Sequence, residues 1–151
     1  MRIALILLAV IVAVILGAAI WFRTVPMPAA VWHVDPGAVA PPGTPNFELL
    51  TGDRAPVFEA APDAMAVRID AVAAAEGADL IGGALADGHM TYVARSRLMG
   101  FPDAISIKLV PVAGGTRMEI FSRSRFGHSD MGVNAARVAR WVAAVRDGIG
   151  A

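Results

Sequence analysis

Four arginines are the residues of this chain whose type and spacing point most directly to chemistry. Arg95 and Arg97 are separated by one residue, and Arg123 and Arg125 repeat that spacing. If each pair lies in a strand, its two side chains share one face and lie about 7 Å apart. At an effective dielectric constant of about 20, two positive charges at that distance repel each other by about 2.4 kcal/mol. A solvated face tolerates this repulsion, whereas a partly buried face requires anions.

The anions could come from within the chain or from outside it. Asp103, Glu119 and Asp130 are available within the same half of the chain, and internal salt bridges are the interpretation that we favour. Arginine also binds carboxylate and phosphate groups through paired hydrogen bonds. An anionic ligand or lipid headgroup is therefore the first alternative, and a partner protein is the second.

The segment Gly127–Asp130 contains the residue types of a Ser-His-Asp triad. Adjacent side chains diverge, however, and a triad requires each member to reach the next. We favour Ser129 or Asp130 as the N-cap of the helix that follows. The functional alternative is an anion site at that helix N-terminus, where Gly127 and Gly132 allow close approach. Asn134 is expected on the buried side of the helix, holding the preceding loop.

Other catalytic arrangements find less support. A hydrolase could use Asp103 and Asp130 as an acid–base couple with His128, but the sequence gives no separation between them. The three histidines of the chain are His33, His89 and His128, and they lack the spacing of metal ligands. The chain has no cysteine and no phosphate-binding glycine loop. We therefore expect no catalytic residue, no metal and no cofactor.

The N-terminal segment Ile3–Phe22 is apolar and uncharged. Twenty helical residues span about 30 Å, which is the thickness of the hydrocarbon layer of a membrane. The aromatic pair at its end, followed by Arg23, is typical of a membrane interface. A cleaved signal peptide is the alternative, because Gly17–Ala19 offers small residues near a cleavage position. We favour a retained transmembrane anchor over residues 1–23.

Charge and small residues add two expectations about this anchor. Arg2 precedes the span and a mainly acidic segment follows Arg23, so the positive-inside tendency places the N-terminus in the cytoplasm and the domain outside. Ala9, Ala13 and Gly17 recur every fourth residue, a spacing that allows close contact with a partner helix. The predicted location is the bacterial inner membrane, single-pass, with the C-terminal domain in the periplasm.

Proline recurs through Thr24–Asn46, which disfavours helix and sheet and favours extended chain. Residues 24–45 are therefore predicted to be a semi-rigid spacer that holds the domain off the bilayer. Trp32 interrupts this spacer and is expected to pack against the domain. Residues 46–151 form the exported domain.

Hydrophobic periodicity predicts the elements of that domain. A helix begins near Asp63, presents Met65 and Ile69 to the core, and ends at Gly77. Four strands and a closing helix to about Asp147 follow. The predicted strands are Asp79–Leu85, Met90–Leu98, Ala104–Val112 and Thr116–Arg125. The fold class is α+β: a four-stranded or slightly larger antiparallel sheet with two helices on one face, preceded by the transmembrane helix.

Alternation along the strands predicts two unlike faces. One face is apolar and covered by the helices; we assign to it Met90, Tyr92, Ala94, Leu98, Ile105, Ile107, Leu109, Met118 and Ile120, with the hydroxyls of Ser96, Ser122 and Ser124. The other face, or its rim, collects the four arginines, Arg117 and Glu119. On the closing helix, Val138, Trp141, Val142, Val145 and Ile149 form the apolar stripe, and Arg137, Arg140 and Asp147 are expected on the other side.

Two segments carry a resemblance to a known family. TYVARSRLMGFPDAISI and FSRSRFGHSDMGVNAARV resemble the bacterial and plastid family named domain of unknown function 1499, over about residues 44–146. The matching positions are Arg95, Ser96, Phe101, Pro102, Asp103, Ser122, Ser124, Arg125, Gly127, Ser129, Asp130, Gly132 and Asn134. The resemblance implies an exported or membrane-attached protein and carries no activity. Members often have Asn-Cys-Val where this chain has Asn46–Glu48, so a role tied to that cysteine is absent.

The functional hypothesis that we favour is an accessory or assembly subunit, without catalysis, whose exported domain docks on a membrane complex or envelope partner. The first alternative is a module that binds phosphate, carboxylate or acidic lipid through the arginines, and the second is a hydrolase. A net charge of zero gives no reason to expect nucleic acid. The expected partners are the membrane, a membrane protein complex, and an anionic ligand or lipid headgroup.

Overall fold

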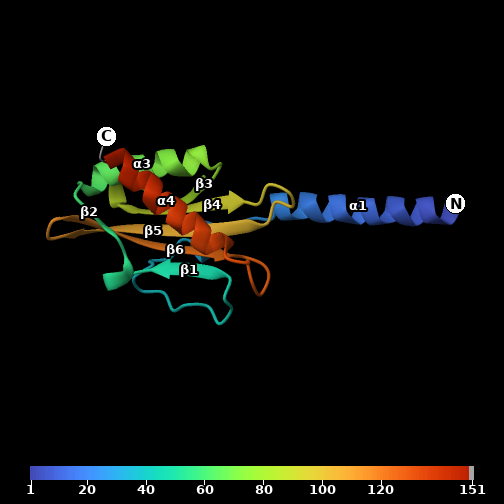
Figure 1. Cartoon of the computed structure of the whole chain (residues 1–151), viewed down its shortest axis with the longest axis horizontal. Helices are drawn as coiled ribbons and strands as arrows, with labels where there is room; N and C mark the ends of the chain where they lie inside the picture. Colours follow the sequence, from blue (N-terminus) through green and yellow to red (C-terminus); the bar gives the residue numbers. More distant parts are fainter. Residues whose placement is uncertain (150–151) are drawn as a thin grey trace.

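One antiparallel sheet of six strands is the centre of the computed structural model, which describes residues 1–149 (Figure 1). The order along the sheet is β1-β6-β5-β4-β3, and β2 also pairs with β6. The fold is therefore α+β as expected, with two short strands added to the four long ones; the last residues of the expected domain, 150–151, lie outside the described part. The strands are β1 (Phe47–Leu50), β2 (Val57–Phe58), β3 (Asp79–Ala84), β4 (His89–Arg95), β5 (Pro102–Val112) and β6 (Gly115–Ser124).

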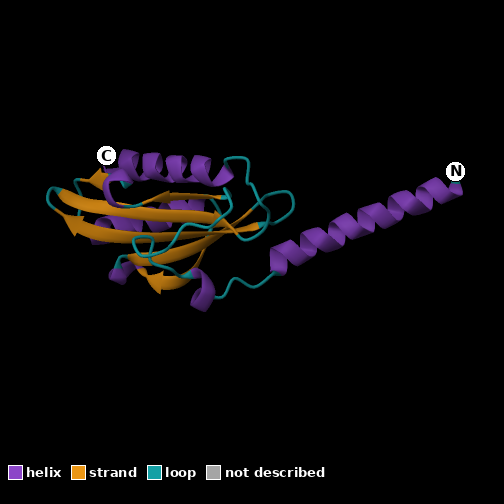
Figure 2. Ribbon diagram, turned by 90° about the horizontal axis from the view of Figure 1, so that it is seen from below, coloured by secondary structure: helices purple, strands orange, loops and turns teal. Residues whose placement is uncertain are grey.

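Two helices, α3 (Pro62–Ala75) and α4 (Val133–Ile149), cover one face of the sheet (Figures 1 and 2). Pro62 starts α3 with Ala61 at its N-cap, so Asp63 lies in the first turn rather than at the cap. The helix ends before Gly77, whose positive φ of 69° stops it as expected. The core between helices and sheet contains the predicted side chains, including Met65, Ile69, Tyr92, Ile105, Ile107, Met118, Ile120, Val138, Trp141 and Val145.

Strand β4 is shorter than the apolar pattern predicted. It ends at Arg95, and the next residues form a turn in which the amide of Gly100 donates to the carbonyl of Ser96. Leu98, expected in the core, is 84% exposed in this turn, and Arg97 and Ser96 are exposed with it. The expectation that Arg97 shares the face of Arg95 is therefore wrong, because the chain leaves the sheet between them.

Part of the proline-rich segment lies against the domain rather than extending away from it. Residues 25–35, which we call the strap, lie on the sheet face opposite α3 and α4 and include the short helix α2 (Ala29–Trp32) (Figure 2). Met27 of the strap is buried against Val93 and Ala104 of the sheet, with Trp32 packed beside them. Prolines remove backbone donors and leave carbonyls free, and donors from the sheet face take up those carbonyls. This exchange explains why the segment adheres to the domain.

Helix α1 (Arg2–Thr24) projects from one end of the sheet (Figure 1). It is long and apolar enough to cross a membrane, a property that a signal sequence shares. Ala9, Ala13 and Gly17 are exposed on it, so a contact with a partner helix stays a prediction.

Candidate functional site

The two motif segments line a pocket. Both segments lie at the end of the sheet next to α1 (Figure 1). Its volume is about 370 Å³. Pairing of β5 with β6 places Asp103 opposite Ser124, and this register brings the turn after β4 together with the loop before α4. The lining residues are Ser96, Phe101, Pro102, Asp103, Ser124, Phe126, Gly127, Ser129, Asp130, Met131 and Val133.

A buried ion pair lies at the base of this pocket. Arg137 Nη2 donates to Asp103 Oδ2 over 2.8 Å, and the two residues are 7% and 6% exposed. Arg137 Nη1 also donates to Ser122 Oγ and to Asn134 Oδ1. The prediction that Arg137 lies on the solvent side of its helix is wrong. Arg137 follows Asn134 by three residues and precedes Trp141 by four, so it lies beside the buried stripe.

Asn134 holds the motif segments together. Its Nδ2 group lies within hydrogen-bond distance of Asn46 O, Ser124 Oγ and Asp130 Oδ2, and its Oδ1 accepts from Ser122 Oγ at 2.6 Å. An amide has two donor hydrogens, so the three acceptors share them. The side chain is fully buried. The expected position of Asn134 and its contact with the preceding loop are confirmed.

Asp130 caps α4, as predicted. Its carboxylate accepts from the amides of Gly132 and Asn134, the latter over 2.7 Å. Partial burial alone would raise the pKa of Asp130, but these hydrogen bonds outweigh it and hold the pKa below the usual value of 3.8. The helix N-terminus therefore already has its anion. Ser129 Oγ accepts from the amide of Met131 and stabilises the same loop.

The carboxylates of the pocket are held in structural contacts. Asp103 is neutralised by Arg137, and Asp130 is held by amides of its own helix. His128 is exposed and does not line the pocket with them. A general base must be within hydrogen-bond reach of its substrate with a pKa near the working pH. The arrangement therefore gives little support to a hydrolase that uses these three residues.

The arginines of the opposite face bind the strap and the end of α1. Arg95 donates to the carbonyls of Phe22 and Val25, Arg123 donates to Trp32 O over 2.7 Å, and Arg125 donates to Pro26 O. Internal salt bridges were the interpretation that we favoured for these arginines. This interpretation is wrong, because the arginine side chains donate to backbone carbonyls rather than to carboxylates. The expected carboxylates are engaged elsewhere: Asp103 by Arg137, Glu119 by Arg117, and Asp130 by the helix N-terminus.

Arg123 is the most deeply placed of these arginines. It is 8% exposed, and its guanidinium lies 4.5 Å from the ring centre of Phe121 and 5.1 Å from that of Trp32. Burial lowers the pKa of Arg123 to about 10, so the group stays charged at neutral pH. Anion binding by the arginines stays a prediction, and it would require the strap to leave.

The strap also brings His33 over the sheet. Its Nδ1 lies 2.9 Å from Thr91 Oγ1, and its ring centre lies 3.9 Å from that of His89. This close approach depends on Gly82, because a Cβ there would lie 2.9 Å from His33 Cβ. Asp35 of the strap also forms an ion pair with Lys108 of β5 on this face.

We predict that acid loosens the strap. Burial, and secondly the charge of His89, hold the pKa of His33 below its usual 6.5. The docked strap therefore favours neutral His33. This preference stabilises docking fully above pH 6.5. It is lost as pH falls through the pKa that His33 has when the strap is undocked, and then through the lower pKa that His33 has when the strap is docked. Hydrogen exchange of α2, corrected for intrinsic rates, should rise as the pH falls from about 7.5 to about 5.5. His33→Gln should flatten this rise, and an unchanged profile in the variant would contradict the assignment.

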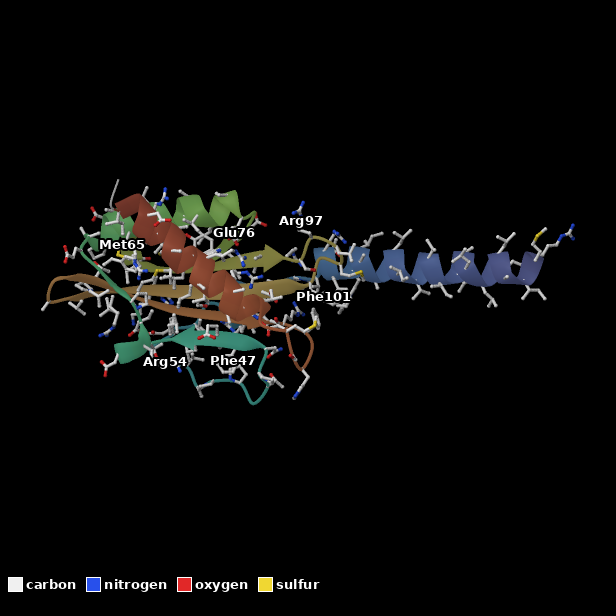
Figure 3. The ribbon with its side chains drawn as sticks, viewed as in Figure 1. Phe47, Arg54, Met65, Glu76, Arg97 and Phe101 are labelled. Carbon is white, nitrogen blue, oxygen red and sulfur yellow. The ribbon has the colours of Figure 1, made fainter. Side chains whose placement is uncertain are left out.

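An aromatic cluster joins the pocket to α1. The ring centres of Phe22 and Phe101 are 4.2 Å apart, and those of Trp21 and Phe126 are 5.4 Å apart. Arg23 donates to two carbonyls of the turn after β4. Figure 3 shows Phe101 beside the end of α1. The site and the apolar helix are thus adjacent parts of one structure.

Two residues of the site carried no clear signal in the sequence. Arg137 was assigned to the wrong side of its helix, although its spacing from Asn134 and Trp141 could have shown that it borders the core. Asn46 is buried and its Nδ2 donates to Gly127 O over 2.7 Å. Its position just before β1, which pairs with β6, is what brings it to the loop.

Fold and site together define a class of protein: an α+β domain in which two motif segments close a pocket at one end of an antiparallel sheet, next to an apolar N-terminal helix. The chain belongs to the family described as "Protein of unknown function (DUF1499)", which matches residues 40–145. No curated protein and no solved structure matched the chain. The match begins after the strap, so the segment that covers the arginines lies outside it.

Proposed function

We propose that this chain is a membrane-anchored accessory or assembly subunit, without catalysis, whose domain docks on a membrane complex or envelope partner. In this proposal α1 is a retained, single-pass anchor in the bacterial inner membrane, and the domain lies in the periplasm. The helix runs without a break through Gly17–Ala19, and its last turn packs on the domain through Trp21 and Phe22. Continuity and packing both support retention.

The observation that carries the proposal is the surface at the α1 end of the domain. Leu98 is 84% exposed and Met131 is 94% exposed, although both are large and apolar. Met131 lines the pocket together with the partly exposed Phe101 and Val133, and contiguous exposed apolar surface marks sites of interaction. The polar groups behind them are engaged in structural hydrogen bonds, which supports docking over chemistry.

A photo-crosslinking residue in place of Leu98 tests this proposal in the native membrane. We expect one discrete product heavier than the chain, and the same partner should co-purify in mild detergent. The matched control places the probe at Val67 of α3, which is 64% exposed and lies away from the pocket; it should give no such product. A strict monomer with neither a crosslinked product nor a co-purifying partner would count against the function.

A further inference from the structure

The mouth of the pocket lies beside the last turn of α1. Phe101 and Phe126 line the pocket and are the same rings that pack on Phe22 and Trp21. Aromatic residues at the end of a membrane helix lie at the level of the lipid headgroups. When α1 spans the bilayer, the pocket therefore opens at the membrane surface.

The lining of the pocket is mainly apolar. Phe101, Pro102, Phe126, Met131 and Val133 contribute to it, and Val133 is 48% exposed at its edge. Its volume of about 370 Å³ falls in the lower part of the range of ligand pockets, about 300–1,000 Å³. Such a pocket suits part of a chain-like apolar ligand.

The charges of the pocket select against an anion. Asp103 is neutralised by Arg137, whereas Asp130 remains ionised and receives only amide donors in the contacts described above. The described lining contributes hydroxyls and carboxylates and contains no arginine or lysine. A phosphate group or a free fatty-acid carboxylate would meet like charge here, whereas an uncharged chain would not.

The backbone at the rim is strained. Met131 has a φ of 53° and is the one non-glycine residue with positive φ among those described. Left-handed backbone at a non-glycine residue is unfavourable and gathers at functional sites. Here the left-handed backbone places the apolar side chain of Met131 at the mouth of the pocket, where it would contact a bilayer.

We infer that the pocket takes one acyl chain of a bilayer phospholipid, whose charged headgroup stays outside the mouth. This inference rests on the proposed function in one respect, since it requires α1 to be a retained anchor. It goes beyond that function by assigning the pocket a ligand. The exposed Leu98, which does not line the pocket, remains available for a protein partner.

The test uses the full chain reconstituted in phosphatidylcholine vesicles that contain a phospholipid with a diazirine at the end of one acyl chain. After illumination, peptide mapping should find adducts on residues 96–103 and 124–133, besides those on residues 2–24. Val133→Trp fills the pocket and should reduce the pocket adducts about tenfold, because excluding even two methylenes from a buried site costs that factor. Val67→Trp on α3 is the matched control and should leave them unchanged.

A second variant guards against misfolding. Met131→Gln changes a residue that is 94% exposed, so it should keep the fold while reducing the pocket adducts several-fold. Adducts confined to residues 2–24, or pocket adducts unaffected by Val133→Trp, would overturn the inference and leave the anchor intact. Stronger labelling by a free fatty acid with the same diazirine would overturn the choice of a phospholipid. An absence of adducts on residues 2–24 would overturn the anchor, and the inference with it.

Discussion

Replacing Asp103 with leucine is expected to lower the free energy of unfolding by about 3–5 kcal/mol, because it leaves the buried Arg137 without its anion. Arginine cannot shed its proton to escape this cost. Chemical denaturation of the full chain in mild detergent, followed by near-ultraviolet circular dichroism, measures the loss. Arg137→Met should cost less, since the carboxyl group that remains can take up a proton.

The double variant Asp103→Leu, Arg137→Met separates lost charge balance from lost packing. It should recover most of the stability, because apolar residues of similar volume often replace a buried ion pair without loss. Ser122 still donates to Asn134 in this variant, so its hydroxyl is not left without a partner. Glu76→Gln is the matched control: its pair with Arg140 lies on the exposed side of α4 and should contribute at most about 1 kcal/mol. A double variant as unstable as Asp103→Leu would contradict the explanation.

The helix-covered side of the domain could be predicted from the sequence because local rules decide it. Alternation placed Ile105 and Ile107 in the core, and helical spacing placed Trp141 there. Strand ends were less predictable: Leu98 continues the apolar pattern of β4, yet hydrogen bonds of the following turn take the chain out of the sheet. Periodicity reports which side a residue faces only while the element continues.

The strap could not be predicted, because its contacts join distant parts of the chain. Proline content suggested an extended and solvated segment, whereas Ala29–Trp32 is helical and the strap packs on the sheet. Three of the four arginines lie on one face that needs acceptors, but those acceptors are carbonyls rather than the expected anions. The carbonyls of the strap and the arginines of the sheet face are each other's hydrogen-bond partners: Trp32 O accepts from Arg123, and Pro26 O accepts from Arg125. Composition gives the groups that need partners, whereas topology decides which ones meet.

Methionine at Arg95, Arg123 and Arg125 together should release the strap and raise hydrogen exchange of α2 at least about a hundredfold. A four-residue helix is unstable by itself, so the protection of the amides of Val31 and Trp32 depends on docking. Hydrogen bonds to charged groups contribute about 1.5–3 kcal/mol each. Losing two of them already corresponds to about a hundredfold change in the opening equilibrium.

The control for this variant is Arg97→Met, because Arg97 is exposed in the turn after β4 and its side chain makes no hydrogen bond to the strap among the described contacts. It should leave the exchange of α2 unchanged. Amides of β5 and β6 should stay protected in both variants, since the core on the helix side is intact; their exchange reports whether the domain as a whole has opened. If α2 stays protected in the triple variant, apolar packing of Met27 and Trp32 alone holds the strap, and the arginines of this face are free to serve another purpose.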